Sequence, residues 1–439
     1  MKPEVGSDTR GRRWAGVVTG LMLVNALPAI TGLITAPLQA RALGVEGRGT
    51  LAAIVVPLSV APILLNFGIM QFAGKEAARG RRLGPLIGSL GAVYLGIGAC
   101  ALLLAVPTAG FFAEGRETVE VFLIIGFCLL PIILQGQLLL AVNSGLQRWR
   151  WVIGAQLIPA LTTLIGIVTL YVLGELTVTS AATLVIVGAL GAIVPLVSVL
   201  KRAMPLEIDS ALVREGVPFG LKAWLGTVAS YANVRLDQLL MIRWVSAREL
   251  GLYVVAATIA SASGIVAAAV AGASNPRIAR GDRVFAARAL RVALAAVTLL
   301  HLFLAALTPW LLDVLFGEEF GDATSMAWIL LVGGVPLAGA TILANALISA
   351  GRPALSAWGE VIALSITIPG LALLLPRYGG DGAAIVSLAA YSANFVFLLL
   401  RSRRIFQCPL SWFLLPRPGD VRWTMRLLKF RRGGTERSA

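Results

Sequence analysis

The residues of this sequence best suited to chemistry lie within one apolar stretch, residues 219–245, which is long enough to cross a lipid bilayer. Five polar or charged side chains interrupt it: Lys222, Asn233, Arg235, Asp237 and Gln238. A charged side chain near the centre of a membrane span costs about 2.5–3.5 kcal/mol to insert. Charges in such a span are typical of a buried or water-lined polar site, and we predict a site of this kind here.

The polar residues of this stretch divide between two faces of a helix, because successive residues are about 100° apart. Lys222, Asn233 and Asp237 share the first face, and Tyr231, Arg235 and Gln238 share the second. Arg235 and Asp237 therefore do not neutralise each other, since side chains two residues apart do not face one another. Each needs a partner on another helix, in water or on a substrate. We expect Asp237 to face a central cavity or the opposite half of the molecule, and a structural ion pair between helices is the alternative for both charges.

Further polar residues fall at two places in other apolar spans. Asn25 and Gln39 share one face of residues 14–39, either as the lining of a cavity or as a polar surface on which helices pack. Glu360 lies just inside residues 357–376, either as a site for a coupling ion or as a carboxylate at the membrane interface. Asp237 is the other candidate for ion coupling.

The sequence carries none of the familiar motifs for nucleotide hydrolysis, metal-dependent proteolysis or a nucleophilic hydrolase. Its three cysteines, Cys100, Cys128 and Cys408, have neither the spacing of metal ligands nor a pairing pattern. We therefore predict no catalytic residue, no metal and no cofactor. Energy for any work that the protein performs has to come from an ion gradient, the membrane potential, or the supply and removal of a substrate.

The composition of the whole chain is that of a membrane protein. Of its 439 residues, 58% are hydrophobic and only 13% are charged, and the mean hydropathy is +0.85. A soluble protein would carry roughly 25% charged residues. We predict an all-α polytopic membrane protein with about twelve spans: residues 14–39, 50–74, 85–112, 121–142, 152–173, 181–200, 218–244, 250–273, 290–316, 324–349, 357–376 and 383–401.

The distribution of lysine and arginine predicts the orientation in the membrane. If the N-terminus is cytoplasmic, 29 of the 37 basic residues fall in cytoplasmic segments and 5 in outer loops. Because positive residues favour the cytoplasmic side, we expect both termini there. The first apolar stretch follows basic residues as in a signal peptide, but residues 14–39 are too long for one, and we predict a retained span. The net charge of +15 then reflects this asymmetry rather than a nucleic-acid partner.

Matching residues at a nearly constant offset predict an internal repeat. Leu43-Gly44 matches Leu250-Gly251 at an offset of 207, and Gly145 matches Gly351 at an offset of 206. Both halves start from the cytoplasm, so the repeat is parallel. The predicted organisation is a basic N-terminus (1–13), an N-lobe of six spans (14–200), a cytoplasmic linker (201–217), a C-lobe of six spans (218–401) and a basic amphipathic tail (402–439). The tail suits an anionic lipid surface, and a disordered basic tail is the alternative.

With these features, the chain resembles the polysaccharide-transport branch of the multidrug/oligosaccharidyl-lipid/polysaccharide (MOP) exporters, which includes the O-antigen flippases. The motifs that carry the resemblance lie after span 1 (residues 41–49), in span 7 (235–240), at the start of span 8 (249–253), after span 9 (316–320) and before span 12 (378–384). The resemblance implies a MATE-like pair of six-helix lobes around a central cavity. It covers essentially residues 14–401.

The resemblance also implies an activity. Alternating access would move a polyprenyl-diphosphate-linked oligosaccharide across the bacterial cytoplasmic membrane during the synthesis of cell-surface polysaccharide, beside glycosyltransferases or a glycan polymerase. A diphosphate needs cationic partners once it leaves water, and Arg235, Lys222 and Arg41 are candidates for them. The candidate substrate-binding residues are Arg235, Asp237, Asn233, Lys222, Asn25, Gln39 and Arg41.

Two other functions remain as alternatives. A drug or cation antiporter of the same fold would hold cations on acidic residues deep in its lobes, where Asp237 is the single deep carboxylate in the predicted spans. A membrane glycan polymerase or ligase would be expected to present a sizeable outer loop with catalytic residues. No loop predicted between spans is longer than about 17 residues.

Overall fold

The computed structural model of the chain describes residues 6–279 and 282–414, and every regular element within these ranges is a helix. In chain order the α-helices are α1 Gly6–Leu65, α2 Ile69–Ala78, α3 Leu83–Leu103, α4 Ala105–Ala113, α5 Glu117–Gly145, α6 Trp149–Val172, α7 Val178–Gly191, α8 Leu200–Ala203, α9 Ser210–Trp244, α10 Ala247–Ala260, α11 Ala262–Ala279, α12 Arg283–Leu311, α13 Thr324–Ser349, α14 Pro353–Phe406 and α15 Leu410–Leu414. Shorter helical turns are η1 Val194–Val199, η2 Leu312–Phe316 and η3 Glu318–Ala323.

Two of the helices, α1 and α14, each contain two membrane crossings. The helical conformation is interrupted at Gly44 (φ 66°, ψ −177°) and at Gly379 (φ 51°, ψ −131°). Positive φ angles suit glycine, which has no Cβ, so the chain reverses at these two residues without a separate loop. Nine helical segments of the described ranges are long and apolar enough to cross a membrane. Adding the 35-residue α9 and counting α1 and α14 twice gives twelve crossings, which confirms the predicted fold class.

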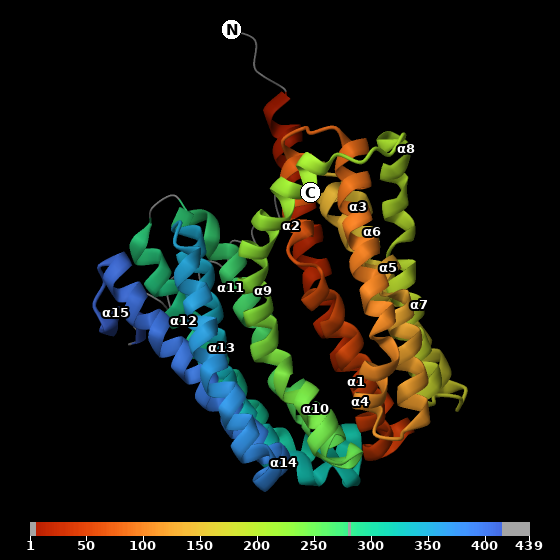
Figure 1. The fold of residues 1–439 in the computed structure, drawn as a ribbon. Helices are drawn as coiled ribbons and strands as arrows, with labels where there is room; N and C mark the ends of the chain where they lie inside the picture. Colours follow the sequence, from red (N-terminus) through yellow and green to blue (C-terminus); the bar gives the residue numbers. More distant parts are fainter. Residues whose placement is uncertain (1–5, 280–281, 415–439) are drawn as a thin grey trace, which may run out of the picture.

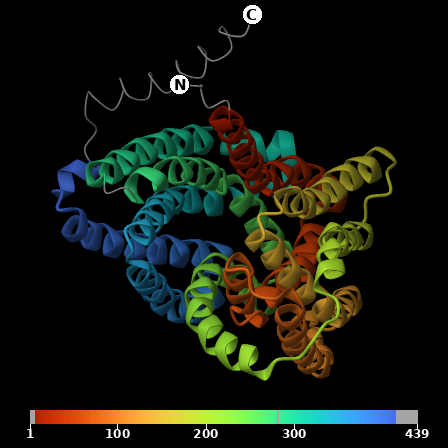
Figure 2. The same ribbon diagram turned by 90° about the horizontal axis from the view of Figure 1, so that it is seen from above.

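The helices form two groups, an N-lobe (α1–α8) and a C-lobe (α9–α15). Figure 1 shows the groups meeting at its lower end and separating toward its upper end, and Figure 2 shows them side by side from above. We call the lower end, with the turns at Gly44 and Gly379, the closed end. The loops predicted to be cytoplasmic lie at the other end, which we call the open end.

Close helix contact and an ion pair join the two lobes at the closed end. A Cβ on Gly49 of α1 would overlap the carbonyl oxygen of Ala247, and a Cβ on Gly251 of α10 would overlap that of Val45. Small residues let membrane helices approach closely, where van der Waals packing stabilises them. Beside this contact, Arg243 of the C-lobe pairs with Glu114 of the N-lobe.

This contact corrects the register of the predicted repeat at its first match. The sequence pairs Gly44 with Gly251, but in the structure Gly44 forms a turn whereas Gly251 lies inside α10. The reciprocal contacts make Gly49 the counterpart of Gly251. Gly44 is needed for a turn and Gly251 for close contact between helices. The amino-acid sequence alone does not distinguish these two roles of glycine.

A hydrophobic core continues through the closed end from one lobe to the other. It includes Ile54 and Leu123 of the N-lobe and Tyr253 and Leu331 of the C-lobe, all fully buried. Separate clusters of buried side chains fill the rest of each lobe. The start of the predicted tail continues α14 as far as Phe406, and the amphipathic part of the tail (422–430) lies outside the described residues.

Candidate substrate site at the lobe interface

Helix α9, which carries the polar residues of the seventh span, contacts both lobes. In its first half, the indole Nε1 of Trp224 donates hydrogen bonds to the carbonyl oxygens of Leu64 (3.0 Å) and Ile63 (3.2 Å) in the N-lobe. These carbonyls lie at the end of α1, where the second span is interrupted before α2, and the Trp224 ring lies 5.1 Å from that of Phe67. Further along, α9 packs against α14 of the C-lobe. The helix therefore connects the two lobes.

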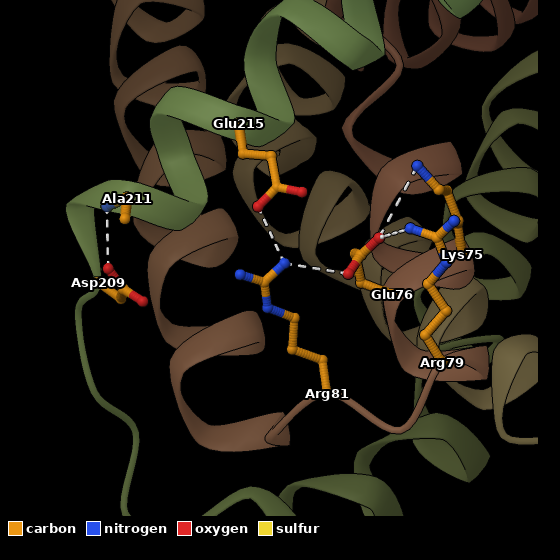
Figure 3. A network of polar contacts seen from close by, with 7 residues as sticks. All are labelled: Lys75, Glu76, Arg79, Arg81, Asp209, Ala211 and Glu215. Carbon is orange, nitrogen blue, oxygen red and sulfur yellow. Dashed lines mark hydrogen bonds and ion pairs between the residues drawn. The ribbon is translucent and has the colours of Figure 1, made fainter.

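An ionic cluster attaches the start of α9 to the N-lobe at the open end (Figure 3). The Arg81 guanidinium is 3.1 Å from Glu76 Oε2 of α2 and 2.9 Å from Glu215 Oε2 of α9. Lys75 and Arg79 also pair with Glu76, which is buried. Burial alone would raise the pKa of Glu76, but hydrogen bonds from Arg81 and Arg79 outweigh it and hold the pKa below its ordinary value.

The Arg235 side chain lies on the face of α9 that turns toward the N-lobe. At about 100° per residue, Arg235 is within about 40° of both Trp224 and Leu239, and each of these contacts or borders N-lobe residues. Arg235 is half-buried, and its Nη1 donates a 2.9 Å hydrogen bond to Gln238 Oε1. In the described part of the chain, no carboxylate forms an ion pair with it. Its charge is thus positioned between the lobes and is not neutralised by an ion pair.

Asp237 points the other way, into the C-lobe, and this differs from the expectation that it faces a cavity or the opposite lobe. It is buried, and its carboxylate accepts hydrogen bonds from the hydroxyl of Tyr253 on α10 and from Ser387 Oγ of α14 (3.4 Å). Its Oδ1 accepts another from the backbone N–H of Gln238 (2.7 Å). Because these donors satisfy the carboxylate, Asp237 contributes a polar centre inside one lobe.

Asn233 and Glu360, predicted separately from two spans, meet in the structure. The Asn233 amide donates hydrogen bonds to Glu360 Oε2 (2.6 Å) and to its carbonyl oxygen (3.0 Å), and the Tyr391 hydroxyl donates to the Asn233 carbonyl (3.4 Å). Glu360 also borders a cavity of about 540 Å³ between α9 and α14. Ser387 and Tyr391 were missed as partners in the sequence, although they lie one helical turn apart in the last span and so share a face of it.

The remaining candidates occupy different places. Lys222 is exposed on α9 near Trp224, and Gln39 is buried on α1. Arg41 does not lie in a central cavity: it is at the closed end, where its Nε donates to the Leu315 carbonyl (3.0 Å). Helix ends leave carbonyl oxygens without helical partners, and a nearby arginine satisfies them. The side chain of Asn25 lies outside the described part of the structure.

The structure has twelve membrane crossings in two lobes that are joined at one end, and α9 contacts both lobes. This is the architecture of a multi-pass membrane transporter. The model of a family described as "Polysaccharide biosynthesis protein" matches residues 17–282. The chain belongs to this family, within the MOP superfamily, as the resemblance implied. No curated protein matches the chain in sequence.

Solved structures of this superfamily share the fold. One is the lipid II flippase MurJ in an inward closed conformation, with 13% identity and a TM-score of 0.70 over 88% of each chain. A multidrug resistance MATE family transporter in an inward-facing conformation has 14% identity and a TM-score of 0.64, covering 87% of this chain and 99% of its own. A MOP superfamily transporter from Pyrococcus furiosus has 14% identity and a TM-score of 0.56, covering 90% and 96%.

Proposed function

We propose that the protein is a flippase that moves a polyprenyl-diphosphate-linked oligosaccharide across the bacterial cytoplasmic membrane by alternating access. Cell-surface polysaccharide synthesis is the process that requires such a step, with glycosyltransferases supplying the substrate and a polymerase consuming it. Membership of the polysaccharide biosynthesis protein family supports this, and so does the likeness in fold to a lipid II flippase.

The observation that carries the proposal is the position of Arg235. It is a permanent cation about nine residues, or roughly 13 Å, inside the closed end of α9, on the face between the lobes. A planar guanidinium binds two phosphate oxygens at once, and its attraction is strong where water is scarce. Lys222, the other cation predicted from this span, is exposed on the face of α9 that Asp237 shares, about 140° around the helix from Arg235, so the proposal rests on Arg235.

Asp237 and Glu360 are our candidates for the coupling ion. Both belong to one polar network of the C-lobe, in which Asn233 bonds Glu360 and, one turn further along α9, Asp237 bonds Tyr253. A proton or cation bound there would change the packing of α9 against α10 and α14. Since α9 also contacts the N-lobe, such a change would alter how the lobes meet.

Complementation of a strain that lacks its own flippase tests the proposal. We expect Arg235→Ala to abolish complementation at normal membrane abundance, and Arg235→Lys to restore it in part, because lysine keeps the charge but not the planar fork. Arg214→Ala, at an exposed arginine of the same helix, is the matched control and should complement fully. Full activity of Arg235→Ala, or loss that merely follows loss of the protein, would contradict the proposed role.

Drug or cation antiport is a second candidate function, favoured by the buried carboxylate of Asp237 in the C-lobe and by the MATE-like fold. The two functions respond differently to substitution. An antiporter should lose cation-driven drug efflux in Asp237→Asn and keep it in Arg235→Ala. A flippase of lipid-linked glycan should depend on Arg235.

A further inference from the structure

An apolar cavity of about 640 Å³ lies where the N-lobe faces α9. Its walls come from the second half of α1, from α3, α4 and α5, and from Leu239 of α9. Among the side chains that line it, only those of Cys100 and Thr108 contain a polar atom. Figure 1 shows the helices that supply these walls, with α1 (red) visible between α9 (green) and α3 (orange). We call the cavity the α3–α9 groove.

The α3–α9 groove lies within the membrane and is open along one wall. Gly96, Cys100 and Leu104 follow each other at intervals of four residues on α3 and just past its end, and all three are exposed. A Cβ placed on Gly96 would meet no atom within 4 Å. Of the surrounding helices, α1, α3 and α5 are long and apolar enough to cross a membrane, and the apolar lining suits a lipid chain better than a water-soluble ligand. Its volume is within the usual range of ligand sites, about 300–1,000 Å³.

The groove meets α9 at Leu239, close to the proposed phosphate site. Phe67 also lines the groove, and its ring is tilted against that of Trp224 of α9, with the ring centroids 5.1 Å apart. Leu239, which borders the groove, lies 15 residues beyond Trp224 along α9, or about 22 Å. Arg235 lies one turn before Leu239 and on nearly the same face. An anionic head at Arg235 and an apolar chain in the groove would therefore be adjacent.

We propose that the α3–α9 groove holds the polyprenyl chain of the substrate while Arg235 binds its phosphate. This inference rests on the proposed function and adds the place of the lipid part. The depth of Arg235 distinguishes this occupant from an ordinary membrane lipid. A phospholipid keeps its phosphate at the membrane surface, whereas Arg235 lies about 13 Å inside the end of α9. A lipid whose head group is carried through the membrane brings its phosphate to that depth.

Photo-crosslinking with a polyprenyl phosphate that carries a diazirine in its chain tests this inference on the purified full-length protein in lipid nanodiscs. The wild-type protein should give adducts on residues 93–104 of the groove wall, mapped by mass spectrometry. Gly96→Phe fills open space in the groove and should reduce these adducts about tenfold, with Gly96→Leu as a smaller replacement. Gly110→Phe is the matched control, because Gly110 of α4 is also exposed with no atom near its Cβ but does not line the groove, and it should leave the adducts unchanged.

Three results would overturn the inference: adducts outside the groove, equal adducts in Gly96→Phe and the wild type, or displacement of the probe by excess phosphatidylglycerol. The last result would assign the groove to ordinary lipid chains. Flipping of a lipid-linked oligosaccharide by the same preparations separates this outcome from failure of the proposed function. If the wild type and Gly96→Phe flip and crosslink equally, the groove inference fails alone. If the wild type flips no such lipid, the proposed function fails, and the crosslinks decide whether the groove holds a polyprenyl chain.

Discussion

Arg235 and Asp237 lie two residues apart on α9 and act on different sides of it. Arg235 faces the N-lobe and bonds Gln238, whereas Asp237 is buried against Tyr253 and Ser387 in the C-lobe. The helical geometry predicts this separation, because side chains at i and i+2 point to different faces. We infer that Arg235 acts on the substrate and that Asp237 acts on the packing of α9 within its own lobe.

Removing the donor to Asp237 should destabilise the C-lobe. Tyr253→Phe leaves a buried carboxylate with one donor fewer, at a cost of about 1–3 kcal/mol in the free energy of unfolding. Thermal unfolding in detergent measures the loss. Tyr391→Phe is the matched control, since that hydroxyl bonds a main-chain carbonyl at 3.4 Å, and it should have the smaller effect. In an Asp237→Asn background the effect of Tyr253→Phe should shrink, and equal effects in both backgrounds would contradict the assignment.

The sequence predicts which residues of α9 are unusual but not where their partners are. The cost of charge in a span singles out Arg235 and Asp237, and helix geometry gives their faces. The partners Tyr253 and Ser387 lie 16 and 150 residues away, so no local pattern reveals them. Arg41 shows the same limit. As an arginine in a family motif it is predicted to bind phosphate, but in the structure it donates to the Leu315 carbonyl oxygen, 274 residues away, and no local pattern predicts that contact.

At the scale of elements, α9 belongs by sequence to the C-lobe and by its first contacts to the N-lobe. The cluster around Glu76 fixes its start, and Trp224 fixes it again at the interruption between α1 and α2. The span after α9 has a similar interruption at Ser261, between α10 and α11. An interrupted helix bends at the interruption. The second span of each lobe therefore has a defined position at which it can bend.

The Glu76 cluster predicts a dependence of stability on pH. The folded-state pKa of Glu76 is below its ordinary value of about 4.3, so its ionised form stabilises the folded protein above that pH. This contribution is lost as the pH falls through the folded-state pKa. Between about pH 5 and pH 3, the unfolding temperature of the wild type should fall more steeply than that of Glu76→Gln.

Glu46→Gln, which changes an exposed carboxylate at the closed end, is the matched control for this pH series and should follow the wild-type curve. Parallel curves for the wild type and Glu76→Gln would show that the cluster does not stabilise the fold. Arg81→Ala should weaken the same pH dependence, because Arg81 connects Glu76 to Glu215.

The hydrophobic runs of the sequence predict the membrane-spanning helices closely, but they do not predict the turns and interruptions between them. The predicted span 324–349 matches α13, and span 121–142 lies inside α5. The turns at Gly44 and Gly379 continue directly from helix to helix, because glycine allows a positive φ without a loop. The interruption at Phe67 follows a run of apolar residues, but its neighbours Asn66 and Gly68 are turn-forming residues that could have predicted it. The Asn66 side chain accepts a 2.7 Å hydrogen bond from the Gly68 N–H, and Gly68 has a positive φ of 69°.

On the scale of the whole molecule, the structure combines a tightly packed closed end with lobes that diverge toward the other end. The Gly49–Gly251 contact and the Arg243–Glu114 pair lie at the closed end. Alternating access requires these contacts to separate when the open end closes. The basic loops predict that the open end faces the cytoplasm, so the structure corresponds to the state that would receive a substrate from inside.

Labelling of single cysteines measures this orientation. In a protein whose three native cysteines are replaced by serine, Glu117→Cys and Glu319→Cys introduce thiols at exposed positions near the closed end. An impermeant maleimide should label both on intact cells. Arg202→Cys, at an exposed position of the open end, is the control and should react after lysis. The reverse pattern would invert the orientation and assign the opening to the outside.

We propose that this protein moves a lipid-linked oligosaccharide between leaflets by means of Arg235. Reconstitution into vesicles with a fluorescent polyprenyl-diphosphate oligosaccharide, with a membrane-impermeant enzyme that cleaves exposed glycans, measures this directly. We expect wild-type protein to expose the inner-leaflet pool to the enzyme, Arg235→Ala to leave that pool protected, and Arg214→Ala to behave as the wild type. A protected inner pool with correctly folded wild-type protein, or equal exposure by Arg235→Ala, would show that the protein does not move this lipid by means of Arg235.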